Sequence, residues 1–343
     1  MHKLFLLLMN LVYADKYNLI VELKSSYSVI QVYENGPIRD LRINTRGTNT
    51  VESRMNMNNP LIPAVGYPNM MLVSLLWNPE PTDILVIGLG AAVLPRILRY
   101  YYPMTRIDIV EIDPNILRIA KEHFRFKTDP LMTVYINDAR IFINSIKKTY
   151  DIILSDVYAE VDVGIPYHLR TLEYTHELKQ RLKVETGVLL THLQRNHNDY
   201  DSSRKIHEHV FKYNYEFVAK NCSFVILLSG FQSLTQSEMF ERAAQLEQTK
   251  CFLFNLTYQV LKLEKQDLFD INAPILKDKI TTPPQRLTLL PMIFVATVGF
   301  LTGCYYSQSI TTKLFLHFNA ASLSIIAHYR STNGYCTQNQ IVV

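Results

Sequence analysis

The feature that most constrains the fold is an uninterrupted apolar strand that runs into a glycine turn and then into a helix. Residues 83–87 read Asp-Ile-Leu-Val-Ile, Gly88-Leu-Gly-Ala-Ala follows, and the next stretch, Val93–Tyr101, has a helical pattern. A strand that is apolar on both faces is typical of a parallel sheet with helices on each side. Gly88 and Gly90 permit a tight turn and the close approach of a ligand to the backbone.

The same alternation of strand and helix continues along the middle of the chain. Further strands are predicted at 107–110, 132–136, 150–155 and 187–193, and further helices at 114–124, 169–182 and 202–212. A last pair of strands, 215–219 and 223–229, is joined by only three residues and must therefore be antiparallel. By analogy, a parallel sheet that ends in an antiparallel hairpin indicates an α/β fold with a Rossmann-like, class I methyltransferase-type sheet.

A β-hairpin is predicted ahead of this sheet. Two β-rich runs, 28–33 and 38–43, flank Asn35-Gly36, and both Asn and Gly tolerate the positive φ of a tight turn. A small N-terminal antiparallel β-domain is therefore expected. A loop at 56–68 and a short helix at 69–77 are predicted to lead from it into the Rossmann-like domain.

Acidic side chains follow three of the predicted parallel strands. Because ligands bind beyond the carboxyl ends of such strands, we expect these acids to lie in one site. Glu111 lies 23 residues after Gly88, where a carboxylate accepts both ribose hydroxyls. Asp138 is a candidate acceptor for an adenine amino group, and Asp156 is expected to face the reacting centre. The alternative is that strand-end acids cap the helices that follow them, and we assign Asp113 to capping.

The glycine turn favours a nucleoside that lacks a pyrophosphate. A phosphate-binding G-x-G-x-x-G motif requires a third glycine where this chain has Val93, and no G-K-[ST] sequence is present. S-adenosylmethionine or its decarboxylated form is therefore favoured over NAD.

The ordered motifs resemble the spermidine synthase (polyamine aminopropyltransferase) family over about residues 20–280. Besides the glycine turn, they are Tyr27-Ser-Val-Ile-Gln-Val-Tyr-Glu-Asn-Gly, Val110-Glu-Ile-Asp-Pro, Asn137-Asp-Ala-Arg-Ile-Phe, Tyr150-Asp-Ile-Ile-Leu-Ser-Asp, Pro166-Tyr-His-Leu-Arg-Thr-Leu-Glu-Tyr and Ala273-Pro-Ile-Leu-Lys-Asp. The resemblance implies an N-terminal β-domain, a Rossmann-like domain and a homodimer. It also implies decarboxylated S-adenosylmethionine as the co-substrate and a polyamine such as putrescine as the acceptor, without a metal.

Carried over position by position, the resemblance assigns roles to individual residues. It implies that Glu111 holds the ribose, and that Asp138 and the backbone of Ala139 hold the adenine. It implies that Asp156 accepts a proton from the attacking amine. Tyr67 matches a substrate-lining tyrosine, although Pro68 follows it where the family usually has a polar residue.

Two acids of the family are missing from this chain. The family's glycine loop carries an aspartate that binds the aminopropyl ammonium group, and this chain has Ala91 there. A second acid is replaced by Ala159, for which Glu160 and Asp162 are candidate substitutes in acceptor binding. Because a buried unpaired charge is expensive, these losses weaken the case for a dicationic acceptor.

Three functions therefore remain open. The first is aminopropyl transfer to a polyamine. The second is methyl transfer from S-adenosylmethionine, which the missing acid at Ala91 favours. The third is a non-catalytic spermidine-synthase-like domain, which the altered loop after Asp156 and the unusual C-terminus favour.

Composition limits the partners. Hydrophobic residues make up 48% and charged residues 19%, which excludes a disordered chain, and the net charge of +4 does not indicate a nucleic-acid partner. The four cysteines form no C-x-x-C pair, so neither a zinc ribbon nor a disulfide scaffold is supported. No metal is expected, and His192, His197, His207 and His209 are interpreted as solvated surface.

The two ends of the chain differ from its middle. The apolar run 4–12 is interpreted as a cleaved signal peptide or as a hydrophobic strand or helix, and the uncharged run 287–306 as a membrane helix or as a buried or dangling segment. The expected division is a leader at 1–19, the β-domain at 20–68, the Rossmann-like domain at 69–282 and an apolar segment with a poorly ordered tail at 283–343. A cytoplasmic location is expected, with membrane association through 287–306 or export as the alternatives.

Overall fold

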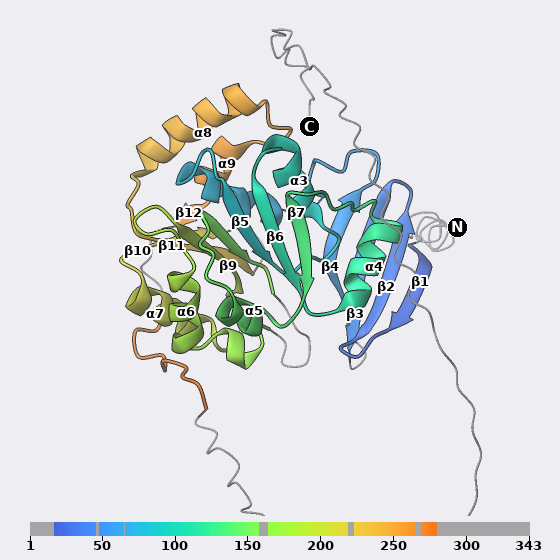
Figure 1. Cartoon of the computed structure of the whole chain (residues 1–343), viewed down its shortest axis with the longest axis horizontal. Helices are drawn as coiled ribbons and strands as arrows, with labels where there is room; N and C mark the ends of the chain where they lie inside the picture. Colours follow the sequence, from blue (N-terminus) through green and yellow to red (C-terminus); the bar gives the residue numbers. More distant parts are fainter. Residues whose placement is uncertain are drawn as a thin grey trace, which may run out of the picture. The chain divides into compact units, whose positions relative to one another are not determined.

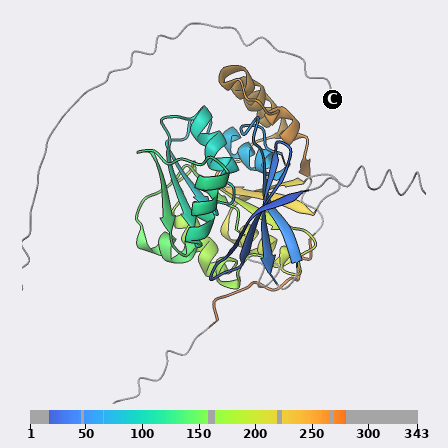
Figure 2. The same ribbon diagram turned by 90° about the vertical axis from the view of Figure 1, so that its right-hand side faces the viewer.

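The computed structural model describes residues 17–45, 48–64, 66–157, 164–218, 223–264 and 269–279, and these residues form two sheets. The first sheet is antiparallel, with its strands in chain order, and lies at the right of Figure 1 and in the foreground of Figure 2. Its strands are β1 Asn18–Lys24, β2 Val29–Asn35, β3 Ile38–Thr45 and β4 Thr48–Asn56. Ile30, Val32 and Leu41 are fully buried in the same hydrophobic core as the second sheet, so the small sheet is packed into the main body.

The predicted hairpin is confirmed, but its turn lies one residue later than expected. β2 pairs with β3 as far as Asn35 opposite Ile38, so Asn35 is the last residue of a strand and Gly36-Pro37 forms the turn. Gly36 has a φ of +55°, and a Cβ there would meet no atom within 4 Å. Glycine is therefore required at this position for its backbone conformation alone.

The second sheet has the strand order β12–β10–β11–β9–β8–β5–β6–β7. β5 pairs in parallel with β6 and β8, β6 with β7, and β8 with β9, whereas β11 is antiparallel to both β9 and β10. The order reverses between β5 and β8, which places the topological switch point at their carboxyl ends. This confirms the predicted class I methyltransferase-type sheet with its antiparallel hairpin. The strands are β5 Asp83–Ile87, β6 Arg106–Glu111, β7 Met132–Ile136, β8 Ile152–Ser155, β9 Val188–Gln194, β10 Tyr213–Val218, β11 Phe224–Gly230 and β12 Leu263–Glu264.

Helices cover both faces of the second sheet, as its unbroken apolar strands require. Leu85 and Ile87 of β5 pack in a cluster with α5, α6 and α7, which lie together at the lower left of Figure 1. Ile84 and Val86 belong to the other core, which contains the remaining α-helices. On the first face lie α5 Ala139–Ser145, α6 Leu172–Gln180 and α7 Tyr200–Val210; on the second lie α2 Tyr67–Met71, the 3-10 helix η1 Leu72–Leu76, α3 Val93–Tyr101, α4 Pro114–His123, α8 Gln236–Lys250 and α9 Leu256–Val260.

Some helix boundaries differ from the prediction. The helix expected at 69–77 begins at Tyr67, because Pro68 lies in the first turn, where its missing N–H is tolerated. The helix expected at 169–182 is shorter: the 3-10 helix η3 (Tyr167–Leu169) precedes it, and Thr171 caps α6. α8 was not predicted, although its capping box, Thr235 with Glu238, is visible in the sequence.

Both apolar ends that the sequence analysis singled out lie outside the described residues. This holds for the run 4–12 and for the candidate membrane segment 287–306. Among the residues that are described, no helix is long and apolar enough to cross a membrane.

The last described residues, 273–279, form an extended strap that contacts α5 and α6. The Leu172 amide donates to the Leu276 carbonyl at 2.8 Å. Arg140 of α5 donates to both carboxylate oxygens of Asp278, at 2.7 and 2.6 Å. Ile275 and Leu276 pack against the α5, α6 and α7 cluster. The strap is therefore an integral part of the folded body.

We expect a chain truncated after Thr282 to fold cooperatively, because it retains the whole strap, and to be more soluble than the full chain, because it lacks the uncharged run 287–306. Truncation after Asn272 removes the Asp278 ion pairs and the apolar contacts of Ile275 and Leu276. This shorter chain should lose about 3 kcal/mol or more of unfolding free energy. Thermal and denaturant unfolding of both truncations tests this, and equal stability would show that the strap contributes nothing.

A network of ion pairs surrounds two buried carboxylates, Asp83 and Asp151, at the start of β5. The Asp83 carboxylate meets Arg106 Nε at 2.8 Å and Lys148 Nζ at 3.1 Å. Asp151 Oδ2 accepts from Lys183 Nζ at 2.8 Å and from the Asp83 amide at 2.9 Å. Burial opposes the ionisation of both carboxylates, but it is outweighed by the combined hydrogen bonds and charges, from Arg106, Thr82 and Lys148 at Asp83 and from Lys183 and two backbone amides at Asp151. The pKa values of Asp83 and Asp151 are therefore lowered.

This network should make the fold sensitive to acid. A carboxyl group whose pKa is lowered by folding contributes stability above its unfolded pKa of about 3.9, and that stability is lost as the pH falls toward the folded value. The unfolding free energy of the wild type should therefore decrease below about pH 4, and that of Asp83→Asn should decrease less steeply. Denaturant unfolding between about pH 5 and about pH 3 measures both slopes. Parallel slopes would exclude Asp83 as a source of the acid sensitivity.

Candidate active site

The predicted strand-end residues converge on one edge of the second sheet. The parallel register places Ile87 of β5 beside Val110 of β6 and Ser155 of β8, and Glu111 beside Ile136 of β7. The backbone hydrogen bonds between neighbouring strands continue one residue beyond the strand ends. The Gly88 amide donates to the Val110 carbonyl, the Asp156 amide to Ile87 and the Asn137 amide to Glu111, each at 2.9 or 3.0 Å. These hydrogen bonds fix the backbone at this edge of the sheet. They place neighbouring segments there that carry the glycine turn, Glu111, Asp138 and Asp156.

The glycine turn lies in direct contact with the strand end that carries Asp156. Gly88 has a φ of +95°, and a Cβ there would lie 2.2 Å from the Asp156 carbonyl oxygen. Gly90, at φ +51°, faces Ser53 of β4 from the N-terminal sheet. Gly88 is required by both its φ and this close packing, whereas the φ of Gly90 favours glycine but resembles that of Ala92, at +58°, in the same turn. Ala91 is fully buried, and the turn itself carries no acid.

Glu111 is held in place by two backbone amides. Its Oε2 accepts from the Leu89 amide at 3.0 Å and its Oε1 from the Asp113 amide at 2.9 Å. Burial raises the pKa of Glu111, and these amides oppose that effect. An ionised carboxylate has about four lone-pair positions, of which the Leu89 and Asp113 amides occupy two. The Ile112 amide also lowers the pKa of Glu111.

Asp138 caps α5, so the capping alternative applies to it as well as to Asp113. Its Oδ1 accepts from the amides of Arg140 and Ile141, and its Oδ2 lies 2.8 Å from Nε2 of His168. Burial opposes ionisation, but His168 and the amides outweigh it, so the pKa of Asp138 is lowered. One lone pair of Oδ2 remains for a ligand donor. Ala139 is the first residue of the helix that Asp138 caps.

Asp156 forms a pair that the sequence analysis missed. Its Oδ1 lies 2.8 Å from Nδ1 of His192 on the neighbouring strand β9. The His192 ring stacks on Tyr67, with centroids 4.5 Å apart and planes at 17°. Tyr67 in turn donates its hydroxyl to the Glu52 carbonyl at 3.3 Å. Tyr67, predicted to line the substrate site, is thus linked to Asp156 through His192.

The interpretation of the histidines as solvated surface was wrong for two of them. His192 is 3% exposed and His207 is 5% exposed. Nδ1 of His207 lies 2.8 Å from the Ser229 hydroxyl, and burial lowers the pKa of His207 to about 4. For His192, the available signal was a titratable residue in the carboxyl half of a mostly apolar strand that follows the one leading to Asp156.

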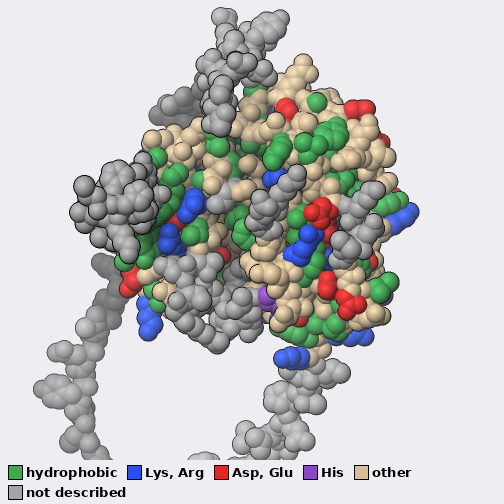
Figure 3. All heavy atoms as spheres, turned by 180° about the vertical axis from the view of Figure 1, so that it is seen from behind, with side chains coloured by type: hydrophobic (Ala, Val, Ile, Leu, Met, Phe, Trp, Pro, Cys, Tyr) green, Lys and Arg blue, Asp and Glu red, His purple; other side chains and the backbone are tan. Residues whose placement is uncertain are grey.

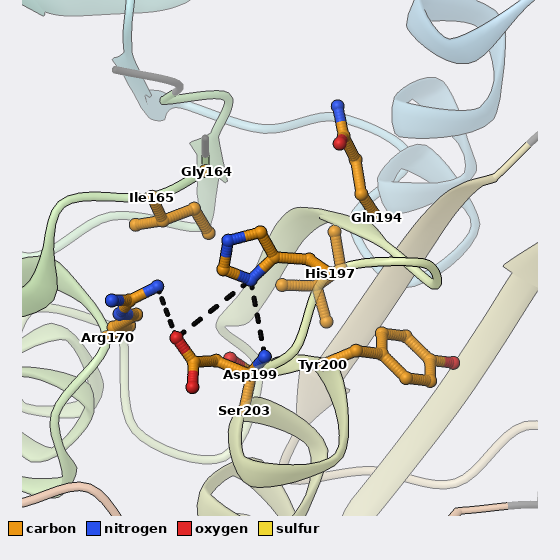
Figure 4. Close-up of a pocket in the computed structure, with 9 residues that line it drawn as sticks. Gly164, Ile165, Arg170, Gln194, His197, Asp199, Tyr200 and Ser203 are labelled. Carbon is orange, nitrogen blue, oxygen red and sulfur yellow. Dashed lines mark hydrogen bonds and ion pairs between the residues drawn. The ribbon is translucent and has the colours of Figure 1, made fainter. Parts of the chain in front are cut away.

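The chain re-enters the described structure at Gly164, beside a second polar cluster (Figure 4). There Nη1 of Arg170 lies 2.6 Å from Oδ2 of Asp199, and the Asp199 amide donates to Nδ1 of His197 at 3.3 Å. A Cβ on Gly164 would lie 2.6 Å from Nε2 of His197, so glycine permits this close approach. The cavity lined by these residues measures about 20 Å³, room for about one water molecule.

Two predicted acceptor-binding residues, Glu160 and Asp162, lie outside the described residues, as does Ala159. In the described part of the chain, no three His, Cys, Asp or Glu side chains are placed to hold a metal ion. Basic and acidic side chains of the described residues are interspersed on the face shown in Figure 3.

Sequence comparison identifies relatives of this chain. The model of the family described as "Spermine/spermidine synthase domain" matches residues 66–235. A polyamine aminopropyltransferase of Vibrio vulnificus is 33% identical over 233 residues, which are 66% of this chain and 77% of that protein. The mouse eEF1A lysine and N-terminal methyltransferase is 39% identical over 94 residues, which are 25% of this chain and only 14% of that protein.

Solved structures show the same fold. A probable spermidine synthase from Corynebacterium glutamicum has a TM-score of 0.59 at 16% identity and covers 77% of this chain and 98% of its own. Human methyltransferase-like protein 13, solved in complex with SAH, has a TM-score of 0.50 at 26% identity. It covers 60% of this chain and 96% of its own. The fold is that of a Rossmann-like transferase. The chain belongs to the spermine/spermidine synthase family, which includes the polyamine aminopropyltransferases.

Proposed function

We propose that this chain transfers an aminopropyl group from decarboxylated S-adenosylmethionine to an amine of a polyamine such as putrescine. The observation that carries the proposal is the convergence of Glu111, Asp138 and Asp156 beside the glycine turn, in a member of this family. The Vibrio relative, of which the chain covers 77%, is named for this activity.

The donor would bind along the sheet edge. The carboxylate of Glu111 suits ribose hydroxyl donors, and the remaining lone pair of Asp138, with the Ala139 amide, suits the adenine edge. The glycine turn lets the donor approach the backbone between them. These residues bind and orient the donor, and none of them takes part in bond making.

The reaction is a direct displacement. A neutral amine attacks the methylene carbon bonded to the sulfonium, the C–N bond forms, and the C–S bond breaks with its electron pair returning to sulfur. The products are methylthioadenosine and a secondary ammonium, whose proton passes to Asp156. The residues of the site accelerate the reaction by aligning amine and carbon and by accepting that proton.

Methyl transfer from S-adenosylmethionine is the second candidate. It is favoured by Ala91, which removes the acid expected to bind the aminopropyl ammonium, and by the similarity to the mouse methyltransferase. The fold of human methyltransferase-like protein 13, a complex with SAH, is compatible with it. The same sheet edge would then bind a donor that carries a carboxylate.

Ligand binding and product analysis separate the candidates. We expect decarboxylated S-adenosylmethionine and methylthioadenosine to raise the melting temperature more than S-adenosylmethionine does, and mass spectrometry to detect spermidine formed from putrescine. Preferential stabilisation by S-adenosylmethionine, with no aminopropylated product, would favour methyl transfer. No stabilisation by any of the three would favour a non-catalytic domain.

Glu111→Gln should weaken methylthioadenosine binding while the protein stays folded. Glutamine keeps one oxygen to accept from a backbone amide, but a charge-assisted bond to the ribose is lost, which costs about 1.5–3 kcal/mol, or about 10- to 100-fold in Kd. Glu111→Ala should lose as much affinity and also some stability, because the Leu89 and Asp113 amides lose their acceptor. Calorimetry is the measurement, with Glu241→Gln, an exposed position on α8, as the control. Unchanged affinity in Glu111→Gln would remove Glu111 from the site.

A further inference from the structure

His192 lies beside Asp156 because of the sheet register. β8 and β9 are parallel, and Ser155 lies opposite Thr191. The residues that follow these two along the chain, Asp156 and His192, are therefore neighbours. The side chains meet at Oδ1 and Nδ1, 2.8 Å apart. His192 belongs to a regular buried strand, which gives it a more rigid position than a loop residue would have.

Aromatic side chains hold the His192 ring on two sides. Tyr67 stacks on it at 4.5 Å between centroids and 17° between planes. Phe224 of β11 contacts it edge-on, at 5.2 Å and 67°. The ring plane is therefore set by packing from α2 and β11, and Nδ1 is directed at Asp156 independently of any ligand.

This contact determines how the Asp156 carboxylate is used. An ionised carboxylate only accepts hydrogen bonds, so Nδ1 of His192 carries the proton and donates to Oδ1. The bond restrains rotation of the carboxyl group and leaves Oδ2 to receive the proton of the attacking amine. A carboxylate without this restraint samples orientations that do not face the amine, which reduces the population of near-attack geometry.

The burial of the two side chains decides which of them meets the amine. Nε2 of His192 is inaccessible to solvent, whereas 18% of the Asp156 side chain is exposed. A group that accepts a proton from the substrate must reach it directly or through one water. Asp156 meets that condition, and His192 acts through Asp156.

We propose that His192 is a positioning residue for Asp156: held by Tyr67 and Phe224, it donates from Nδ1 to one carboxylate oxygen and orients the other toward the acceptor amine. The inference rests on the proposed aminopropyl transfer.

Three substitutions test the donor role. Asn places its amide nitrogen at the same number of bonds from Cβ as Nδ1 of histidine, Gln places it at the position of Nε2, and Leu has no donor. We expect His192→Leu to lower kcat with putrescine about 10-fold or more, His192→Asn to restore it to within about 3-fold of the wild type, and His192→Gln to lie below His192→Asn. Affinity for methylthioadenosine should stay within about 2-fold in all three, because Glu111 and Asp138 are untouched.

The design separates positioning from packing and from failure of the proposed function. If His192→Leu does not melt cooperatively, the comparison of Asn with Gln decides, since both place an amide in the same buried space. An equal loss of kcat in His192→Asn and His192→Leu would overturn the positioning role alone. So would an unchanged kcat in every variant of an active enzyme.

A wild type that transfers no aminopropyl group to putrescine, spermidine or cadaverine would overturn the proposed function and this role with it. His209→Gln, an exposed position on α7, serves as the matched control.

Discussion

Asp156→Asn is expected to lower kcat for aminopropyl transfer about 100-fold or more, because it keeps the shape of the side chain and removes its capacity to accept a proton. The asparagine oxygen still accepts from Nδ1 of His192, so the stack with Tyr67 and the sheet register are retained. Affinity for methylthioadenosine should change little, since Glu111 and Asp138 would bind the nucleoside.

Steady-state kinetics with putrescine and calorimetry with methylthioadenosine measure the two quantities separately. Glu241→Gln makes the same carboxylate-to-amide change on the exposed surface of α8 and should leave both unchanged. An active wild type together with an equally active Asp156→Asn variant would exclude Asp156 as the proton acceptor. A parallel loss of kcat and of nucleoside affinity would indicate instead that the variant distorts the whole sheet edge.

Gly88→Ala is expected to reduce the unfolding free energy by about 3 kcal/mol or more and to abolish nucleoside binding. A φ of +95° costs an alanine about 1–3 kcal/mol, and its Cβ would lie 2.2 Å from the Asp156 carbonyl oxygen. The position of the Cβ is fixed by the backbone and the carbonyl oxygen is itself a backbone atom, so no side-chain rotation relieves the contact. The glycine turn and the Asp156 strand end must move apart, which disrupts the ligand edge.

Gly36→Ala provides the matched control, because Gly36 also has a positive φ, of +55°, but a Cβ there meets no atom within 4 Å. This variant should show only the conformational cost, about 1 kcal/mol. The difference between the two unfolding free energies reports the contact with Asp156 together with the greater strain of an alanine at φ +95°. Equal destabilisation, with methylthioadenosine still bound by Gly88→Ala, would show that the turn tolerates a side chain.

The parallel sheet could be predicted because its local signals agree with one another. Asp83–Ile87 is apolar at every position, and the glycine turn and a helix follow directly. Pro114 after Asp113 marked the start of α4, and the short link between β10 and β11 required an antiparallel pair. Each signal acts over a few residues, where propensity and chain geometry dominate.

The relations among side chains from distant segments were not predictable in this way. The spacing of Glu111 and Asp156 from their strands indicated the ligand edge, but the partner of Asp156 lies 36 residues away on another strand. His207 was interpreted as solvated surface, yet it is buried and meets Ser229. Such contacts depend on strand order and helix packing, which no local pattern contains.

What the sequence determined by itself is the order of strands and helices, the glycine turn and the positions of Glu111, Asp138 and Asp156 at strand ends, because hydrophobic periodicity and the conformational freedom of glycine are properties of short segments. What only the tertiary structure decided is how these residues are supported: Glu111 by the amides of Leu89 and Asp113, Asp138 by His168, and Asp156 by His192 beneath Tyr67. The reason is that hydrogen bonds and ring contacts form between groups brought together by folding, at separations along the chain that composition and periodicity do not report.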